Sequence, residues 1–98
     1  MELSITNYKM MIEEWERTLT KEGSLPTKAE LLSALQFICN SQGGGISADL
    51  EGKLLYLLAL ERSKQEEQDD LYYLLLEEAN RLLDNRSEIQ RLLETKQL

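Results

Sequence analysis

The residues of this chain best suited to chemistry are its carboxylates, because its 98 residues include no histidine and a single cysteine. Histidine is the commonest general base and metal ligand, so serine triads, cysteine–histidine dyads and histidine-based zinc sites are excluded. Carboxylates from two facing helices can hold Mg²⁺, which keeps several waters for reaching a phosphate. Acidic residues spaced three apart occur in three pairs, which are Glu13 with Glu16, Glu66 with Asp69, and Glu67 with Asp70.

This pattern loosely resembles the MazG-like nucleotide pyrophosphohydrolases, all-helical enzymes that pair an E-E-x-x-E helix with an E-x-x-D helix. The run Glu13-Glu14-Trp15-Glu16 and the pair Glu66 and Asp69 carry the resemblance, although Arg17 stands where the motif has a glutamate. The resemblance implies a Mg²⁺-dependent phosphohydrolase. In a chain with 18 acidic residues a solvated charged face is the favoured interpretation, so we expect no catalytic residue, metal site or cofactor.

The charge balance indicates which partners suit the chain. Eleven Lys and Arg against 18 Asp and Glu give a net charge of −7, which repels nucleic-acid phosphates and anionic lipids and tolerates a basic protein. The N-terminus lacks the features of a secretory signal. The longest apolar run, 54–60, is seven residues long, whereas a membrane span needs roughly 20. We therefore expect a cytoplasmic protein that binds neither nucleic acid nor membrane.

The composition predicts an all-α fold. Leucine occurs 21 times against five isoleucines, and valine is absent, so the β-branched residues that strands favour are scarce. One domain over residues 1–98 is expected, a small bundle of four to five mostly antiparallel helices with a leucine-rich core. The predicted helices cover approximately 5–22, 28–40, 48–62, 65–84 and 87–96.

Several local signals support these boundaries. Thr27 and Glu30 have the spacing of a capping box, in which each side chain accepts a hydrogen bond from the other residue's backbone amide.

The three glycines 43–45 predict a mobile connector. Cys39, within an apolar stretch, is expected to be a small buried thiol. A near-heptad spacing favours a continuous helix from 65 to 96, whereas Asp84 and Asn85 favour a break between two helices.

Two apolar runs, 54–60 and 71–76, exceed what one central helix would bury. Consecutive apolar residues point all round a helix, so such a helix needs cover on every side. We expect part of this surface to meet another chain, with a homodimer as the first choice. The alternative is that one run forms the central helix and the tyrosines of the other lie half exposed. The candidate interface residues are Leu71, Tyr72, Tyr73, Leu74, Leu75, Leu76 and Tyr56.

These observations favour a non-catalytic protein–protein interaction module, an adaptor or regulatory subunit that acts through apolar helix faces. A small acidic inhibitor of the immunity, antitoxin or counter-defence type, which blocks a basic protein, is the alternative. The phosphohydrolase is the remote third choice.

Overall fold

The computed structural model describes residues 5–40, 45–64 and 70–94, and every regular element within these ranges is a helix. The helices are α1 (Ile5–Glu22), α2 (Lys28–Asn40), α3 (Gly45–Lys64), α4 (Asp70–Leu82) and α5 (Ser87–Glu94). The chain is therefore all-α, as its composition predicts. None of the described helices combines the length and the apolar character needed to cross a membrane.

The boundary between α1 and α2 follows from two end signals. Gly23 has a left-handed φ of 69°, and its N–H donates to the Leu19 carbonyl at 2.9 Å, which closes α1 as glycine commonly does. The predicted capping box is confirmed. The Glu30 N–H donates to the Thr27 hydroxyl at 3.2 Å, and the Thr27 N–H donates to the Glu30 carboxylate at 3.4 Å.

A break separates α4 from α5, so the alternative of one continuous helix is wrong. Asp84 and Asn85 both adopt left-handed φ values, 62° and 64°. The Asn85 N–H donates to the Asn80 carbonyl at 2.8 Å, the bond that ends a helix in a Schellman-type cap. Helix α3 also begins at Gly45, earlier than expected. Positions 41–44 and 65–69, which include most of the predicted glycine connector, lie outside the described residues.

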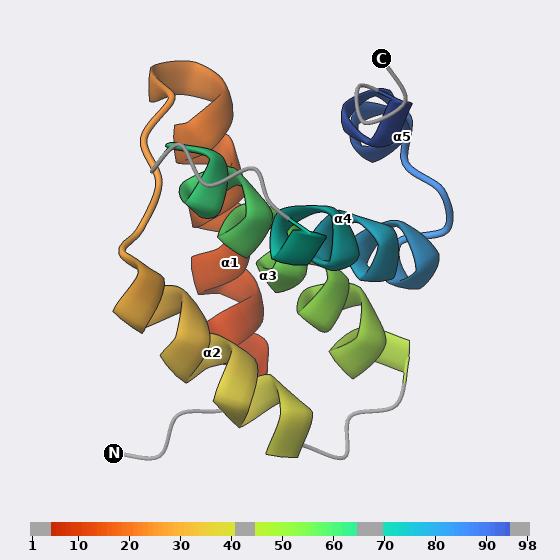
Figure 1. Ribbon diagram of the computed structural model, residues 1–98. Coiled ribbons are helices and arrows are strands. Elements are labelled where there is room, and N and C mark those ends of the chain that lie inside the picture. Colours follow the sequence, from red (N-terminus) through yellow and green to blue (C-terminus); the bar gives the residue numbers. More distant parts are fainter. Residues whose placement is uncertain (1–4, 41–44, 65–69, 95–98) are drawn as a thin grey trace.

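Helix α3 is the central element and packs against α1, α2 and α4. In Figure 1, α1 and α2 lie toward the left of the view, and α4 and α5 lie toward the right. Two clusters of buried side chains result. The first joins α3 to α1 and α2 through Ile12, Leu31, Ala34, Ile38, Leu50, Leu54, Leu57 and Leu58. The second joins it to α4 and α5 through Ala59, Tyr72, Leu76, Ala79, Leu83 and Ile89.

A glycine allows α3 and α4 to approach closely. A Cβ atom at Gly52 would lie 2.8 Å from Leu83 Cγ and 3.0 Å from Leu82 Cβ. Both distances are shorter than a normal carbon–carbon contact. Because Gly52 has no Cβ atom, the end of α4 can pack directly against α3.

Cys39 is exposed, so the expectation of a buried thiol is wrong. Neighbouring helical residues point about 100° apart, and Ile38 takes the inward position, where it is 1% exposed. The Cys39 thiol instead donates to Glu51 Oε1 of α3 at 3.1 Å. Partial desolvation raises the pKa of the thiol, and the Glu51 carboxylate raises it further through the hydrogen bond and its charge. The thiol is therefore protonated at neutral pH.

Candidate functional site

The apolar run of α4 is divided between the interior and the surface. Tyr72 and Leu76, four residues apart, are buried in the second cluster, whereas Leu71 and Leu74 remain 47% and 59% exposed. Since α3 occupies the central position, α4 needs only one buried face. Of the predicted interface residues, Leu71 and Leu74 therefore lie where a partner can reach them, and Tyr72 and Leu76 do not.

The remaining predicted interface residues, Tyr56, Tyr73 and Leu75, are half-buried and pack against the second cluster. The rings of Tyr72 and Tyr73 meet edge to face, with their centroids 4.9 Å apart. Burial raises the pKa of the Tyr56 hydroxyl and of the Tyr72 hydroxyl, so both stay neutral at physiological pH. These tyrosines serve the packing of the chain itself more than a surface for a partner.

Leu71 and Leu75 line a groove of about 230 Å³ between α4, α3 and α2, which we call the α2–α4 groove. Leu32 of α2, which is 45% exposed, lines it from the opposite side. Its other lining residues are Leu35, Leu58, Lys28, Glu61 and Arg62. This surface thus combines an apolar floor with side chains of both charges.

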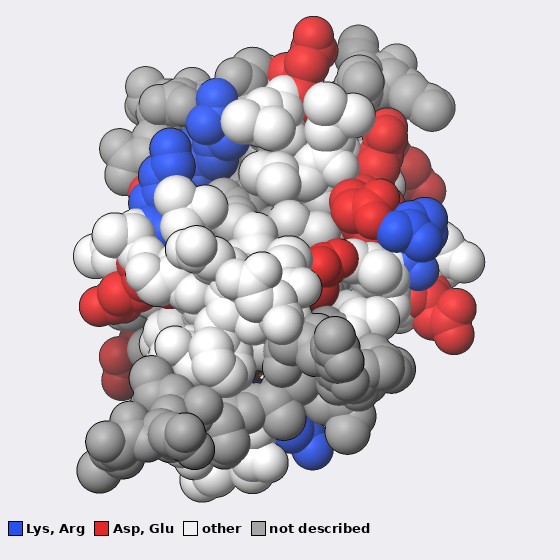
Figure 2. Space-filling model, turned by 90° about the horizontal axis from the view of Figure 1, so that it is seen from below, with Lys and Arg blue, Asp and Glu red and all other residues white. Residues whose placement is uncertain are grey.

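Uncharged surface is not confined to small patches. Figure 2 shows one face of the molecule on which uncharged side chains fill most of the middle, with acidic and basic side chains toward its edges. Protein interfaces likewise have a centre depleted of charged residues and a polar margin.

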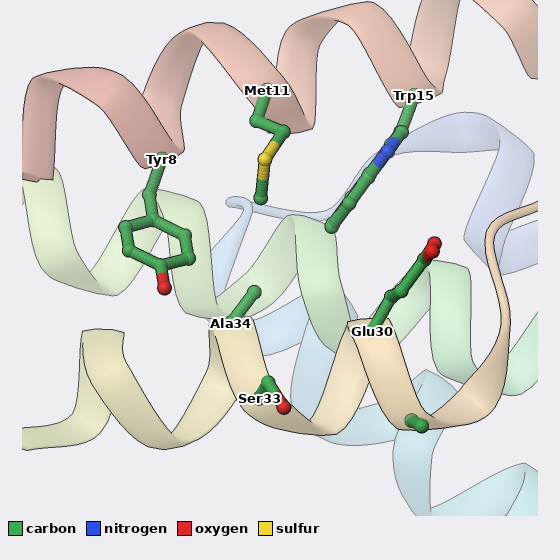
Figure 3. Close-up of a pocket in the computed structure, with 7 residues that line it drawn as sticks. Tyr8, Met11, Trp15, Glu30, Ser33 and Ala34 are labelled. Atoms are coloured by element: carbon green, nitrogen blue, oxygen red, sulfur yellow. The ribbon is translucent and has the colours of Figure 1, made fainter. Parts of the chain in front are cut away.

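A second and larger groove, of about 450 Å³, lies between α1 and α2, and we call it the α1–α2 groove. Both helices pack on α3 more than on each other. The rings of Tyr8 and Phe37 stack between them, with centroids 4.3 Å apart. Figure 3 shows Tyr8, Met11 and Trp15 extending from α1 toward α2. On the α2 side the groove is lined by Ala29, Glu30, Ser33 and Ala34.

The α1–α2 groove continues beyond Trp15. A neighbouring hollow of about 220 Å³ shares Trp15 and Glu30 with it and reaches Thr18, Ser24, Leu25 and Pro26. Among the described residues that line the two hollows, Glu30 is the one charged side chain. The capping box orients this carboxylate, because Glu30 Oε2 accepts the Thr27 N–H.

Sequence reasoning missed this groove. Tyr8, Ile12 and Trp15 follow one another at intervals of four and three residues, which places them on one side of a helix. Because Ile12 is buried, this pattern predicts that all three face a single core. The sequence feature that could have indicated the groove is the pair of methionines, Met10 and Met11, beside this apolar stripe. They are 66% and 40% exposed, and such flexible apolar side chains are common at binding surfaces.

Of the carboxylates that suggested Mg²⁺ chemistry, Glu13 and Glu16 lie beside basic side chains. The Glu16 carboxylate lies 3.6 Å from the Lys53 ammonium of α3, and it accepts a hydrogen bond at 3.3 Å from Arg86, which precedes α5. Glu13 lies 4.0 Å from Lys9 on the same helix. The described part of the chain contains no group of three or more potential metal-ligating side chains. Of the other proposed ligands, Asp70 begins α4, and residues 66, 67 and 69 lie outside the described residues.

Comparison with protein-family models, with curated proteins and with solved structures found no match to this chain.

Proposed function

We propose that this chain is a non-catalytic, cytoplasmic protein–protein interaction module that forms a homodimer through the α2–α4 groove and the adjoining surface of α4. The exposure of Leu71 and Leu74 is the observation that carries the proposal. Single exposed leucines are ordinary, but Leu71 lines an apolar groove together with Leu32 and Leu75, and Leu74 follows Leu71 by three residues, on the same side of α4. A second copy would remove this continuous apolar surface from water.

The local charges of the α2–α4 groove, unlike the net charge of the chain, are compatible with a second copy as the occupant. In a two-fold interface the same patch meets itself, so it must be complementary to itself. The α2–α4 groove has Lys28 and Arg62 together with Glu61, so its lining is of mixed sign. A groove of one sign would instead repel its own copy.

We also propose that the five helices form a mostly antiparallel bundle. Leu58, near the end of α3, lines the same groove as Leu71, at the start of α4. Gly52, in the first half of α3, faces Leu83, just after the end of α4. These contacts support opposite chain directions for α3 and α4.

Size-exclusion chromatography with light scattering tests the dimer, and paired variants test its surface. We expect about twice the 11.3 kDa chain mass for the unmodified protein and the single-chain mass for Leu74→Lys. The matched control is Met10→Lys on α1, which places the same charge on a similarly exposed apolar residue and should leave the dimer intact.

Two results would count against the proposal. A single-chain mass for the unmodified protein at high concentration would show that the chain does not self-associate. A dimeric Leu74→Lys variant would show that another surface makes the contact. Circular dichroism of each variant, recorded alongside, establishes that the helices are retained.

A further inference from the structure

The α1–α2 groove has the length of a short helix. Its lining follows α1 from Tyr8 to Thr18, and ten residues at 1.5 Å per residue span about 15 Å. That distance corresponds to nearly three turns of a second helix lying alongside α1. The groove is also open to solvent at the surface of the chain, so a helix can enter it from the side.

Both walls of the groove suit a helix with an apolar stripe. The α1 wall presents the two aromatic rings of Tyr8 and Trp15 with Met11 between them (Figure 3), and such groups supply most of the contact area in helix-binding grooves. The α2 wall carries the small, exposed side chains of Ala29 and Ser33, which allow a partner backbone to approach closely. The thioether of Met11 can adapt its shape to the side chain that enters.

The charge of the groove determines which charge a partner should carry. Glu30 is the charged residue among the described lining of both hollows, and no described lysine or arginine lines either one. The whole chain carries a net charge of −7. A second copy of the chain, with its own acidic groove, would be repelled here, whereas a basic helix would be attracted and oriented by Glu30.

We propose that the α1–α2 groove binds a cationic amphipathic helix from a partner protein, with the apolar stripe of that helix against Met11 and Trp15 and a Lys or Arg near Glu30. The inference deepens the proposed interaction role, on which it rests, by naming the class of partner. It uses a different surface from the homodimer contact and does not require it.

Trp15 makes binding directly observable, because it is the one tryptophan of the chain and lines the groove. The probe is a synthetic 14-residue peptide without Trp or Tyr, with Leu along one helical face and Lys on the rest. We expect a saturable blue shift of Trp15 emission with a micromolar Kd. The same peptide with Glu in place of every Lys, and a Leu-shuffled peptide of the same composition, should bind at least about tenfold more weakly.

Neighbouring methionines provide a matched pair of variants. Met11→Lys places a charge in the groove and should raise the Kd of the cationic peptide at least about tenfold. Met10→Lys makes the same change on α1 outside the groove lining and should change it less than about twofold. Equal weakening by the two variants, or no saturable shift with the cationic peptide, would overturn the proposal.

The contribution of Glu30 is tested with Glu30→Gln, because glutamine still fits the capping box. We expect the Kd to rise about threefold to tenfold and its salt dependence to decrease. Glu94→Gln on α5 makes the same charge change away from the groove and should have little effect. Equal affinity in the Glu30 and Glu94 variants, or equal binding of the acidic peptide, would overturn the assigned partner charge.

The variant Leu74→Lys separates this inference from the homodimer. We expect it to bind the cationic peptide with the affinity of the unmodified protein, whether or not it is monomeric. Loss of peptide binding in this variant would overturn the assignment of the groove as a separate site. A monomeric unmodified protein that binds the peptide would refute the dimer alone.

Discussion

Replacing Gly52 with alanine should destabilise the fold, although alanine is the better helix former. In an exposed helix the change is expected to add about 1 kcal/mol of stability. At Gly52 the new Cβ would lie 2.8 Å from Leu83 Cγ and 3.0 Å from Leu82 Cβ. The Leu82 atom is attached directly to the backbone, so side-chain rotation alone cannot relieve the contact, and α4 must move away from α3.

The expected size of the effect follows from these two opposing contributions. Overpacking of a tight contact costs about 1–3 kcal/mol, so the free energy of unfolding should fall by about 1 kcal/mol after the gain in helix propensity. Truncation of Leu83 removes two of the three close atoms. In a Leu83→Ala background only the Leu82 Cβ contact at 3.0 Å remains, so the same Gly52→Ala change should be less destabilising, with a coupling of about 1 kcal/mol.

Urea unfolding at one fixed protein concentration measures both values, since self-association would make the stability depend on concentration. Circular dichroism follows all helices, and Trp15 fluorescence follows the first cluster, so coincident curves would establish a single transition. A Gly52→Ala protein about 1 kcal/mol more stable than the original would refute the close approach of α3 and α4. Additive effects of the two substitutions would refute the contact with Leu83.

Three further predictions concern other contacts. Glu16→Gln should lower the free energy of unfolding by about 1–2 kcal/mol, because the largely buried Lys53 loses a partner, whereas the exposed Glu14→Gln control should cost less than about 0.5 kcal/mol in the same urea assay. Asp84→Gly should raise the melting temperature, since glycine tolerates the left-handed φ of 62° and should add about 0.5–1 kcal/mol. The pKa of Cys39 is raised in the folded chain. The neutral thiol therefore contributes its full stabilisation below the ordinary thiol pKa, and this contribution is lost as the pH rises through the pKa of the folded state. Iodoacetamide should therefore modify it more slowly than a peptide thiol at about pH 8, and Glu51→Gln should lower the pKa and speed the reaction; equal rates would contradict the Glu51 contact.

Local sequence signals predicted the start of α2 and offered the end of α4 as an alternative, because both depend on neighbouring residues. The capping box of Thr27 and Glu30 is confirmed by its two hydrogen bonds. Asp84 and Asn85 follow the end of α4 with left-handed backbone angles, as the alternative of two separate helices predicts. Continuity with α5 failed because a near-heptad spacing reports which residues share a face but does not reveal a backbone reversal between them.

The surfaces were harder to predict, because they depend on which helix lies beside which. Run 71–76 is apolar on all sides as a sequence, yet Tyr72 and Leu76 turn inward while Leu71 and Leu74 do not. The stripe of α1 predicts one buried face, but α3 covers only part of it and leaves Trp15 at a groove. Composition revealed that apolar surface was in excess; only the arrangement of α1, α2 and α4 around α3 reveals where.

Helix α2 explains how one small chain can offer two contact surfaces at once. Its buried face, with Leu31, Ala34 and Ile38, lies against α3. One flank, with residues 29, 30 and 33, lines the α1–α2 groove, and the other, with residues 28, 32 and 35, lines the α2–α4 groove. At 100° per residue the two flanks point about 140° apart. A helix bound on one flank therefore does not obstruct a second copy on the other. The cationic peptide should accordingly add its own mass to the dimer without dissociating it, and a peptide that splits the dimer would show that the two surfaces overlap.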